Sequence, residues 1–287
     1  MDSQDRVGIR KMYKLFINGA FARSESARSD QIGGENVAHA SRKDVRDAVV
    51  AARAGFAKWS EQAPATRGLV LYRLAEMMEA RSAELAAQLV TGGTVDAAAA
   101  GREVAAAIDR TVWYAGWGDK YLAVASTRNP VAGPHFNFST AEPTGVVALL
   151  APDEPALLGL VTAVLPALVS GNGVVVVAGE RDPRTAVVFA ECLATSDLAA
   201  GTCNVLTGTR AELGPVLAAH MDVNALGAFG LDPALERKLD ELAAENVKRV
   251  HVEDAPPRDA WFGAGYDDLE RVVAFTELKT IWHPARI

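Results

Sequence analysis

Five short runs of β-branched and apolar residues recur along the second half of the chain, each separated from the next by a stretch with helical spacing. Strands that are apolar on both faces are typical of a parallel sheet, because right-handed crossovers place helices on each side of it. The pattern predicts an α/β fold with a doubly wound, Rossmann-like parallel sheet. The predicted strands are residues 146–150, 174–177, 204–206, 225–229 and 249–252.

The first 125 residues predict a small ribbon followed by helices that pack on the sheet. Residues 13–21 hold two alternating runs around Asn18-Gly19, a pair that favours a type I′ turn because both residues tolerate positive φ. Three helices are then expected over about 41–59, 64–89 and 104–121, from apolar residues at helical spacing. The first begins at Ser41 with Asp44 three residues on, which is close to a capping box.

Two alternating segments lie outside this pattern. Residues 135–139 alternate Phe136 and Phe138 with polar side chains, and residues 275–282 alternate similarly near the other end of the sequence. Two such strands can pair with each other, but a two-stranded ribbon is marginal alone and leaves an open backbone edge. We therefore expect an arm built from residues 126–142 and 272–287, which flanks a sheet domain over residues 143–257.

The turns after the predicted strands carry acids where a bound phosphate would need free backbone N–H groups. The first turn holds Asp153 and Glu154 and has no GxGxxG motif, and Asp182 and Asp232 each precede a proline at the start of a predicted helix. We interpret these acids as helix caps, and the alternative is a functional acidic site. Either interpretation predicts poor dinucleotide binding.

The remaining side chains with reactive or metal-binding potential show no pattern of a site. Cys192 lies on an apolar helical face and Cys203 lies in a predicted strand, so both are interpreted as small core residues. The five histidines lack the spacing of metal ligands, and no metal site is predicted.

Composition narrows the classes of partner. The chain has 287 residues, of which 49% are hydrophobic and 23% charged, as in ordinary globular proteins. Its net charge of −7 disfavours nucleic acid and anionic membranes as partners. The polar N-terminal residues show no apolar signal segment, and two cysteines cannot form a disulfide framework, so we expect a cytoplasmic protein.

Several motifs, taken in order, resemble the NAD(P)-dependent aldehyde dehydrogenase family. The resemblance covers nearly the whole chain, and its order makes it far more specific than any one motif. The matching stretches are residues 13–19, 142–147 with Ala151-Pro152, 166–168, 171–172, 204–208, 220–223, 246–250 and 275–282.

The resemblance implies roles for a few residues and the loss of others. Glu253 falls at the position of the family's general-base glutamate, whereas Glu180 and Gly230 match positions of the cofactor site. By the same alignment, Glu154 replaces an asparagine that helps to hold the oxyanion. Val177 replaces a cofactor-binding lysine, and Leu231 replaces the serine that opens a phosphate-facing helix. The resemblance thus leaves a depleted cofactor site.

The family glutamate is followed by a further domain that carries the nucleophilic cysteine. Here residues 258–271 form a short linker in its place, so the chain is identified as a shortened member without a catalytic cysteine domain. No catalytic residue is therefore assigned, and no cofactor is expected, although NAD or NADP is possible by resemblance. In the family, arms of this kind complete the catalytic-domain sheet of a neighbouring subunit.

These observations favour a non-catalytic (pseudoenzyme) subunit that assembles through its arm with a full-length aldehyde dehydrogenase, or with itself. One alternative is an NAD(P)-linked oxidoreductase that acts on aldehydes only within a complex. A second alternative is a stand-alone protein that binds another small molecule at the strand ends.

Overall fold

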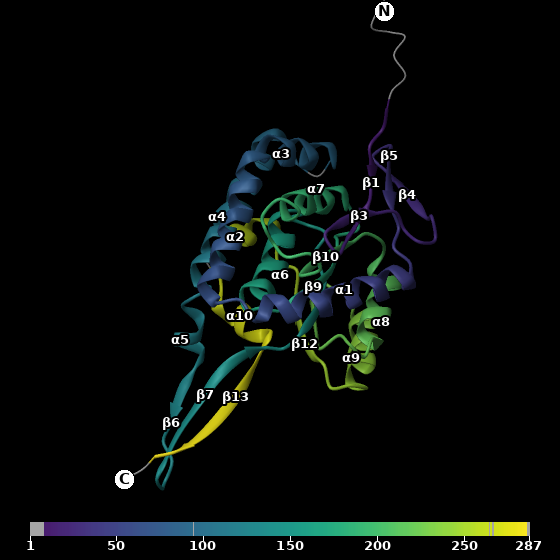
Figure 1. The fold of residues 1–287 in the computed structure, drawn as a ribbon. Helices are drawn as coiled ribbons and strands as arrows, with labels where there is room; N and C mark the ends of the chain where they lie inside the picture. Colours follow the sequence, from purple (N-terminus) through teal and green to yellow (C-terminus); the bar gives the residue numbers. More distant parts are fainter. Residues whose placement is uncertain (1–8, 94, 264, 266, 286–287) are drawn as a thin grey trace, which may run out of the picture.

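The computed structural model of the chain describes residues 9–93, 95–263, 265 and 267–285 (Figure 1). At its centre lies a sheet with the strand order β12-β11-β8-β9-β10-β2-β3. The five strands from β12 to β10 are parallel, which confirms the predicted doubly wound sheet, and each lies within one residue of its predicted bounds. They are β8 (Val146–Leu150), β9 (Gly173–Val177), β10 (Cys203–Leu206), β11 (Ala225–Phe229) and β12 (Arg249–Glu253).

Helices cover both faces of this sheet because alternate strand residues point to opposite sides. Val174 and Val176 belong to one apolar cluster, and Val175 and Val177 to a second. The first cluster includes α6 (Leu158–Val169) and α7 (Arg184–Leu193), and the second includes α8 (Arg210–Ala219) and α9 (Pro233–Ala244). Among the described residues, no helix is both long and apolar enough to cross a membrane.

The predicted N-terminal ribbon is part of the central sheet. β2 (Leu15–Ile17) and β3 (Ala20–Ala22) are joined by Asn18 and Gly19, whose φ angles of 53° and 77° suit the predicted type I′ turn. β2 then pairs antiparallel with β10, Phe16 opposite Val205. A small second sheet has the order β1 (Met12–Tyr13), β5 (Glu35–Ala38), β4 (Ser29–Ile32).

The N-terminal helices follow the prediction with one difference. α1 (Arg42–Ser60) starts with the predicted capping box, in which the N–H of Ser41 and the carboxylate of Asp44 are 2.7 Å apart. The single helix expected over 64–89 is wrong: α2 (Pro64–Ala80) and α3 (Ser82–Thr91) are separated at Arg81, whose ψ of 15° leaves the helical range. The break lets α3 pack on α7, while α2 and α3 both contact α4 (Ala97–Trp117).

The arm projects from the body of the molecule beyond α5 (Tyr121–Ala125) (Figure 1). As expected, β7 (His135–Pro143) and β13 (Thr276–Pro284) pair with each other, antiparallel along their full lengths. The expectation of only two strands is wrong, because β6 (Thr127–Asn129) pairs with the other edge of β7. The Asn129 side chain fixes this third strand by donating to Asn137 and Ser139.

The segment between β12 and β13, expected to be a short linker, is folded into the body. It contains η1 (Arg258–Phe262) and α10 (Leu269–Ala274). The Trp261 side chain is fully buried and packs on the ring of Phe229, with 5.4 Å between ring centroids. Val272 of α10 is buried as well, so this segment covers part of the core.

Candidate functional site

The carboxyl ends of the parallel strands form the candidate site. The strand order reverses between β8 and β11, and ligands of open α/β sheets bind at such switch points. A cavity of about 260 Å³ lies there. We call it the strand-end crevice, and it is lined by Pro152, Asp153, Glu154, Arg181, Arg210, Phe229, Gly230, Ala255, Pro256 and Arg258.

Arg210 crosses this crevice from the first turn of α8. Its side chain is 8% exposed, and its Nη1 donates to the carbonyl of Phe229 at the end of β11 over 3.2 Å. Its Nη2 lies 2.6 Å from Oδ1 of Asp153, which follows β8. A buried guanidinium thus joins the ends of two neighbouring strands at the switch point.

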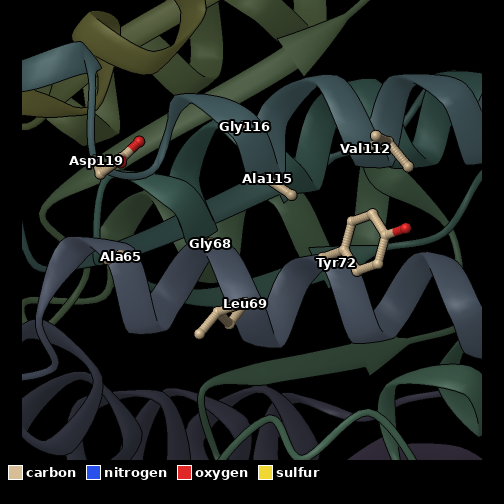
Figure 2. Close-up of a pocket in the computed structure, with 8 residues that line it drawn as sticks. All are labelled: Ala65, Gly68, Leu69, Tyr72, Val112, Ala115, Gly116 and Asp119. Atoms are coloured by element: carbon tan, nitrogen blue, oxygen red, sulfur yellow. The ribbon is translucent and has the colours of Figure 1, made fainter.

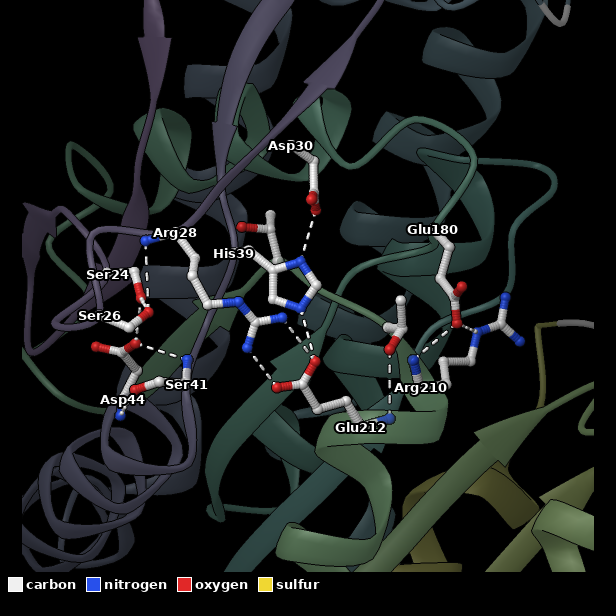
Figure 3. Close-up of polar contacts among 12 residues, drawn as sticks. Ser24, Ser26, Arg28, Asp30, His39, Ser41, Asp44, Glu180, Arg210 and Glu212 are labelled. Carbon is white, nitrogen blue, oxygen red and sulfur yellow. Dashed lines mark hydrogen bonds and ion pairs between the residues drawn. The ribbon is translucent and has the colours of Figure 1, made fainter.

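Glu180, the residue that resembles a ribose-binding glutamate, is engaged by the same helix. Its Oε1 accepts a hydrogen bond of 2.7 Å from the backbone N–H of Arg210 and caps α8 (Figure 3). Its own N–H donates to Asp153 Oδ1, also over 2.7 Å. Glu180, Asp153 and Arg210 therefore form one network within the chain.

The starts of α9 and α7 differ: α9 has the predicted cap, and α7 has no side-chain cap. Asp232 caps α9 as expected, accepting from the N–H of Ala234 with Pro233 first in the helix and Gly230 just before, at a φ of 57°. Asp182 is not a cap: it is buried and pairs with Arg184 at 2.6 Å, because its carboxylate is needed to neutralise that buried guanidinium.

The prediction that Asp153 and Glu154 cap the helix after β8 is wrong, because another residue binds the start of α6. The backbone N–H groups of Leu157 and Leu158 have no acceptor within the helix. They donate instead to Glu103 of α4, at 2.8 and 3.3 Å. Glu103 is fully buried and also pairs with Arg258 of η1. Asp153 and Glu154 instead neutralise Arg210 and Arg181, so they act as ion-pair partners.

These contacts decide whether a dinucleotide fits the crevice. A pyrophosphate at a helix N-terminus needs backbone N–H groups that are free to bind it. Here the first N–H groups of α6, α8 and α9 all donate to carboxylates of the chain. Val177, where the resemblance would place a lysine, is fully buried in β9. The residues present do not fit the cofactor.

Glu253, which resembles the family's general base, ends β12 and is held in a side-chain ion pair. Arg271 of α10 donates to both of its oxygens at 2.8 and 2.5 Å, and Nε2 of His251 lies 3.0 Å from Oε1. Burial acts to raise the pKa of Glu253, but these hydrogen bonds outweigh it and hold the pKa at about 2. A carboxylate so acidic is a poor proton acceptor at neutral pH.

Both cysteines lie in the core, as their sequence contexts indicate. Burial raises the pKa of the Cys192 thiol and of the Cys203 thiol to about 12. A thiolate nucleophile requires a lowered pKa and an exposed, electropositive setting. Neither cysteine has the chemistry of a nucleophile.

His39 is the centre of a second polar cluster, beside the crevice (Figure 3). Its ring nitrogens lie 2.6 Å from Asp30 and 3.0 Å from Glu212, and Arg28 pairs with the same Glu212 carboxylate. The cluster ties the small sheet to α8. The parts of the chain that the structure describes hold no group of three or more metal-ligating side chains.

A larger hollow of about 410 Å³ lies between α2 and α4. Figure 2 shows Leu69 and Tyr72 of α2 and Val112 of α4 along it, with Asp119 at one end. The helices are close here because Gly68 lacks a side chain: an added Cβ would lie 2.7 Å from the carbonyl of Ala115. This mainly apolar groove lacks the convergent polar groups of a catalytic site.

The sequence interpretation missed three residues of this site: Arg210, Glu103 and Arg271. A signal existed for Arg210, because a cation in the first turn of a helix opposes the helix dipole unless an acid lies nearby. Glu103 could have been noticed as a charge on the apolar stripe of its helix, in register with Val104 and Ala107. No local signal marks Arg271, whose partner lies 18 positions away.

Comparison with known proteins agrees with the fold. The family model described as "Aldehyde dehydrogenase family" matches residues 24–258. The cytosolic 10-formyltetrahydrofolate dehydrogenase of Xenopus laevis is 33% identical over 84% of this chain and 28% of its own length. The putative aldehyde dehydrogenase DhaS of Bacillus subtilis is 32% identical, again over 84% of this chain but half of its own length.

A solved structure gives the same result. The C291A mutant of aldehyde dehydrogenase C from Pseudomonas syringae, in complex with NAD+ and octanal, aligns with a TM-score of 0.76 and 29% identity. The alignment covers 84% of this chain and 50% of that one. The chain thus spans about half the length, or less, of the proteins it matches.

Proposed function

This chain belongs to the aldehyde dehydrogenase family, and on that premise we propose that it is a non-catalytic subunit that assembles with a full-length aldehyde dehydrogenase. One observation carries the first part: the charged side chains of the strand-end crevice and Glu253 are engaged by other groups of the same chain. An active site of this family would need a free base, a thiolate and room for the cofactor.

The proposal on chemistry follows from what each candidate group does in the fold. Covalent aldehyde oxidation needs an activated thiolate next to a base and an oxyanion site. Glu253 is paired with Arg271, and both thiols are buried. Glu154 would repel a developing oxyanion, because stabilising that charge requires hydrogen-bond donors.

The test of this part is an activity assay on the purified full chain. With NAD or NADP and short aliphatic or aromatic aldehydes, we expect no reduction of the cofactor. A steady turnover that Cys192→Ala or Cys203→Ala abolishes would overturn the proposal. Glu253→Gln serves as the matched variant for the base, and it is expected to leave the zero rate unchanged.

The arm supports the proposal on assembly. β13 is one of the two outer strands of the arm sheet, and Leu278 and Trp282 on it are 62% and 60% exposed. A long strand edge with exposed apolar side chains favours addition to another sheet. Because the resembled arms complete a catalytic-domain sheet, the complementary acceptor is a full-length aldehyde dehydrogenase. Self-association through the arm is the fallback.

Light scattering after size-exclusion chromatography tests the assembly. The chain mixed with a full-length aldehyde dehydrogenase should give a heteromer, and deletion of residues 277–287 should abolish it. Leu278→Ser with Trp282→Ser is a milder variant that keeps β13 in place. If the intact chain, the deletion and the double variant all remain monomeric beside the full-length enzyme, the arm is not an assembly element.

A second candidate function is an oxidoreductase that binds NAD(P) only within such a complex. The NAD+ complex of the Pseudomonas syringae relative and the retained Glu180 favour it. Cofactor reduction that appears only in the heteromer and is lost with Glu180→Ala would support this candidate over the first.

We also propose a cytoplasmic location. The support is the similarity to relatives named as cytosolic, of which the Xenopus laevis dehydrogenase is one.

A further inference from the structure

β12 is the last strand of the central sheet, and one of its edges is open. It pairs with β11 on one side, and within the described residues no strand pairs with the other side. The N–H of Arg249 donates to Asn224, and the carbonyl of Glu253 accepts from Gly230, so these residues face β11. Since backbone direction alternates along a strand, the N–H and C=O groups of Val250 and Val252 point outward.

The side chains of β12 divide in the same alternating way. His251 and Glu253 lie on the face covered by α10, where His251 contacts the Phe275 ring and Glu253 pairs with Arg271. Arg249 shares this face by alternation and is exposed. Val250 and Val252 pack toward α8 and α9. The strand Arg249-Val250-His251-Val252-Glu253 is thus symmetric in its apolar positions and opposite in charge at its ends.

We propose that two copies of this chain associate by antiparallel pairing of their β12 strands about a two-fold axis at His251. In this register Val250 of one copy lies opposite Val252 of the other, and each such pair exchanges both of its N–H···O bonds. The same register sets Arg249 opposite Glu253 twice, once on each side of the axis. One surface therefore complements itself, as a two-fold interface requires.

Other arrangements of the same edges lose this match. Parallel pairing in register would place Arg249 opposite Arg249 and Glu253 opposite Glu253, and like charges directly opposite are destabilising. An antiparallel shift by two residues places neither Arg249 nor Glu253 opposite the other. Only the antiparallel register centred on His251 therefore brings Arg249 opposite Glu253, whose carboxylate is also bound by Arg271 of its own chain.

This interface is independent of the proposed function, because β12 belongs to the central sheet and not to the arm. The two can be separated by experiment. Deletion of residues 277–287 removes the arm's edge strand and leaves β12 intact, whereas a substitution in β12 leaves the arm intact.

Val250→Pro in the full chain tests the backbone pairing. The N–H of Val250 points outward, so proline removes it without breaking a bond inside the chain, and edge strands tolerate proline at such positions. In sedimentation velocity over a range of concentrations, the dimer dissociation constant should rise at least about tenfold. Val250→Thr retains the N–H and is the matched control, expected to stay within about threefold of the parent.

His251→Cys tests the register. Residues opposite each other in a non-hydrogen-bonded antiparallel pair have Cα atoms about 4.5 Å apart, within the range of a disulfide. Mild oxidation should link two copies of this variant, and the added Val250→Pro substitution should prevent the link. Lys279→Cys on the arm is the control. The yield of disulfide-linked copies of this variant should be the same with and without the Val250→Pro substitution. The native thiols are buried, so they do not compete.

Four results would overturn the inference. The parent chain could remain monomeric at every concentration. Val250→Pro and Val250→Thr could dissociate alike, or His251→Cys could fail to link. A dimer that only deletion of residues 277–287 dissociates would overturn it too, and would leave the arm proposal standing.

Discussion

The strand-end crevice and the arm differ in whether their polar groups have partners within the chain. In the crevice, Asp153, Glu180 and Arg210 bind one another, and the backbone N–H groups that begin three helices donate to carboxylates. In the arm, β13 leaves one edge open over nine residues, with Trp282 exposed on it. In the region that resembles a cofactor site, the charged groups are paired within the chain, although Nε and Nη2 of Arg210 make no hydrogen bond. In the region that resembles an assembly element, a strand edge is left open.

This difference distinguishes a region that must bind a ligand or partner from one that only has to be stable. A ligand site must keep polar groups without internal partners, which costs stability until the ligand binds. Where no ligand is needed, ion pairs and helix caps can fill the same positions. A docking strand must keep its edge available for its partner. The comparison predicts that substitutions in the crevice region change stability, whereas substitutions on the arm change assembly.

The largest effect is expected for Glu103→Ala. The variant leaves the Arg258 guanidinium without its anion and the N–H groups of Leu157 and Leu158 without an acceptor in the core. Removing one partner of a buried pair costs about 3–5 kcal/mol of unfolding free energy. Urea denaturation measures it, with Glu142→Ala on the arm as the exposed control. Equal losses for the two variants would contradict the comparison.

A smaller effect is expected for Glu253, and it depends on pH. Its pKa is about 2 in the fold and about 4.3 in an unfolded chain, so the folded state favours the ionised carboxylate. This stabilisation, about 2–3 kcal/mol, is therefore complete above pH 4.3 and is lost as the pH falls toward 2. Urea denaturation at several pH values should show a flatter acid limb for Glu253→Gln. Identical acid limbs would show that the Arg271 pair adds nothing.

The smallest effect on stability is expected on the arm. Trp282→Ser removes an exposed side chain that packs edge-on against His135, so the unfolding free energy should change by less than about 0.5 kcal/mol. Its effect should appear in the heteromer's dissociation constant instead. A loss of 2 kcal/mol in the isolated chain would mean that the arm is a structural part of the body.

Local patterns in the sequence predict most of this fold. The strands were predictable because each is a continuous apolar run, and the Asn18-Gly19 turn and the Ser41 capping box because each is set by adjacent residues. The break at Arg81 was not, since apolar spacing continues through it and the reason for it is packing of α3 on α7.

The candidate site was predictable only in outline. The acids at the strand ends are visible in the sequence, but their partners are not, because each pairing depends on how the strands are ordered. Asp153 meets Arg210 across 57 positions, and Glu103 meets Arg258 across 155. The third strand of the arm was missed for a local reason, since β6 has only three residues.

Calorimetric titration of the full chain with NAD, and then with NADP, tests the central claim most directly. If the crevice is filled by the chain's own ion pairs and helix caps, the dissociation constant should be millimolar or weaker, because the cofactor would have to displace Arg210 from Asp153 and compete with Glu180 and Asp232 for backbone N–H groups. A dissociation constant of about 10 μM or tighter, equivalent to about 7 kcal/mol of binding free energy, would contradict the account.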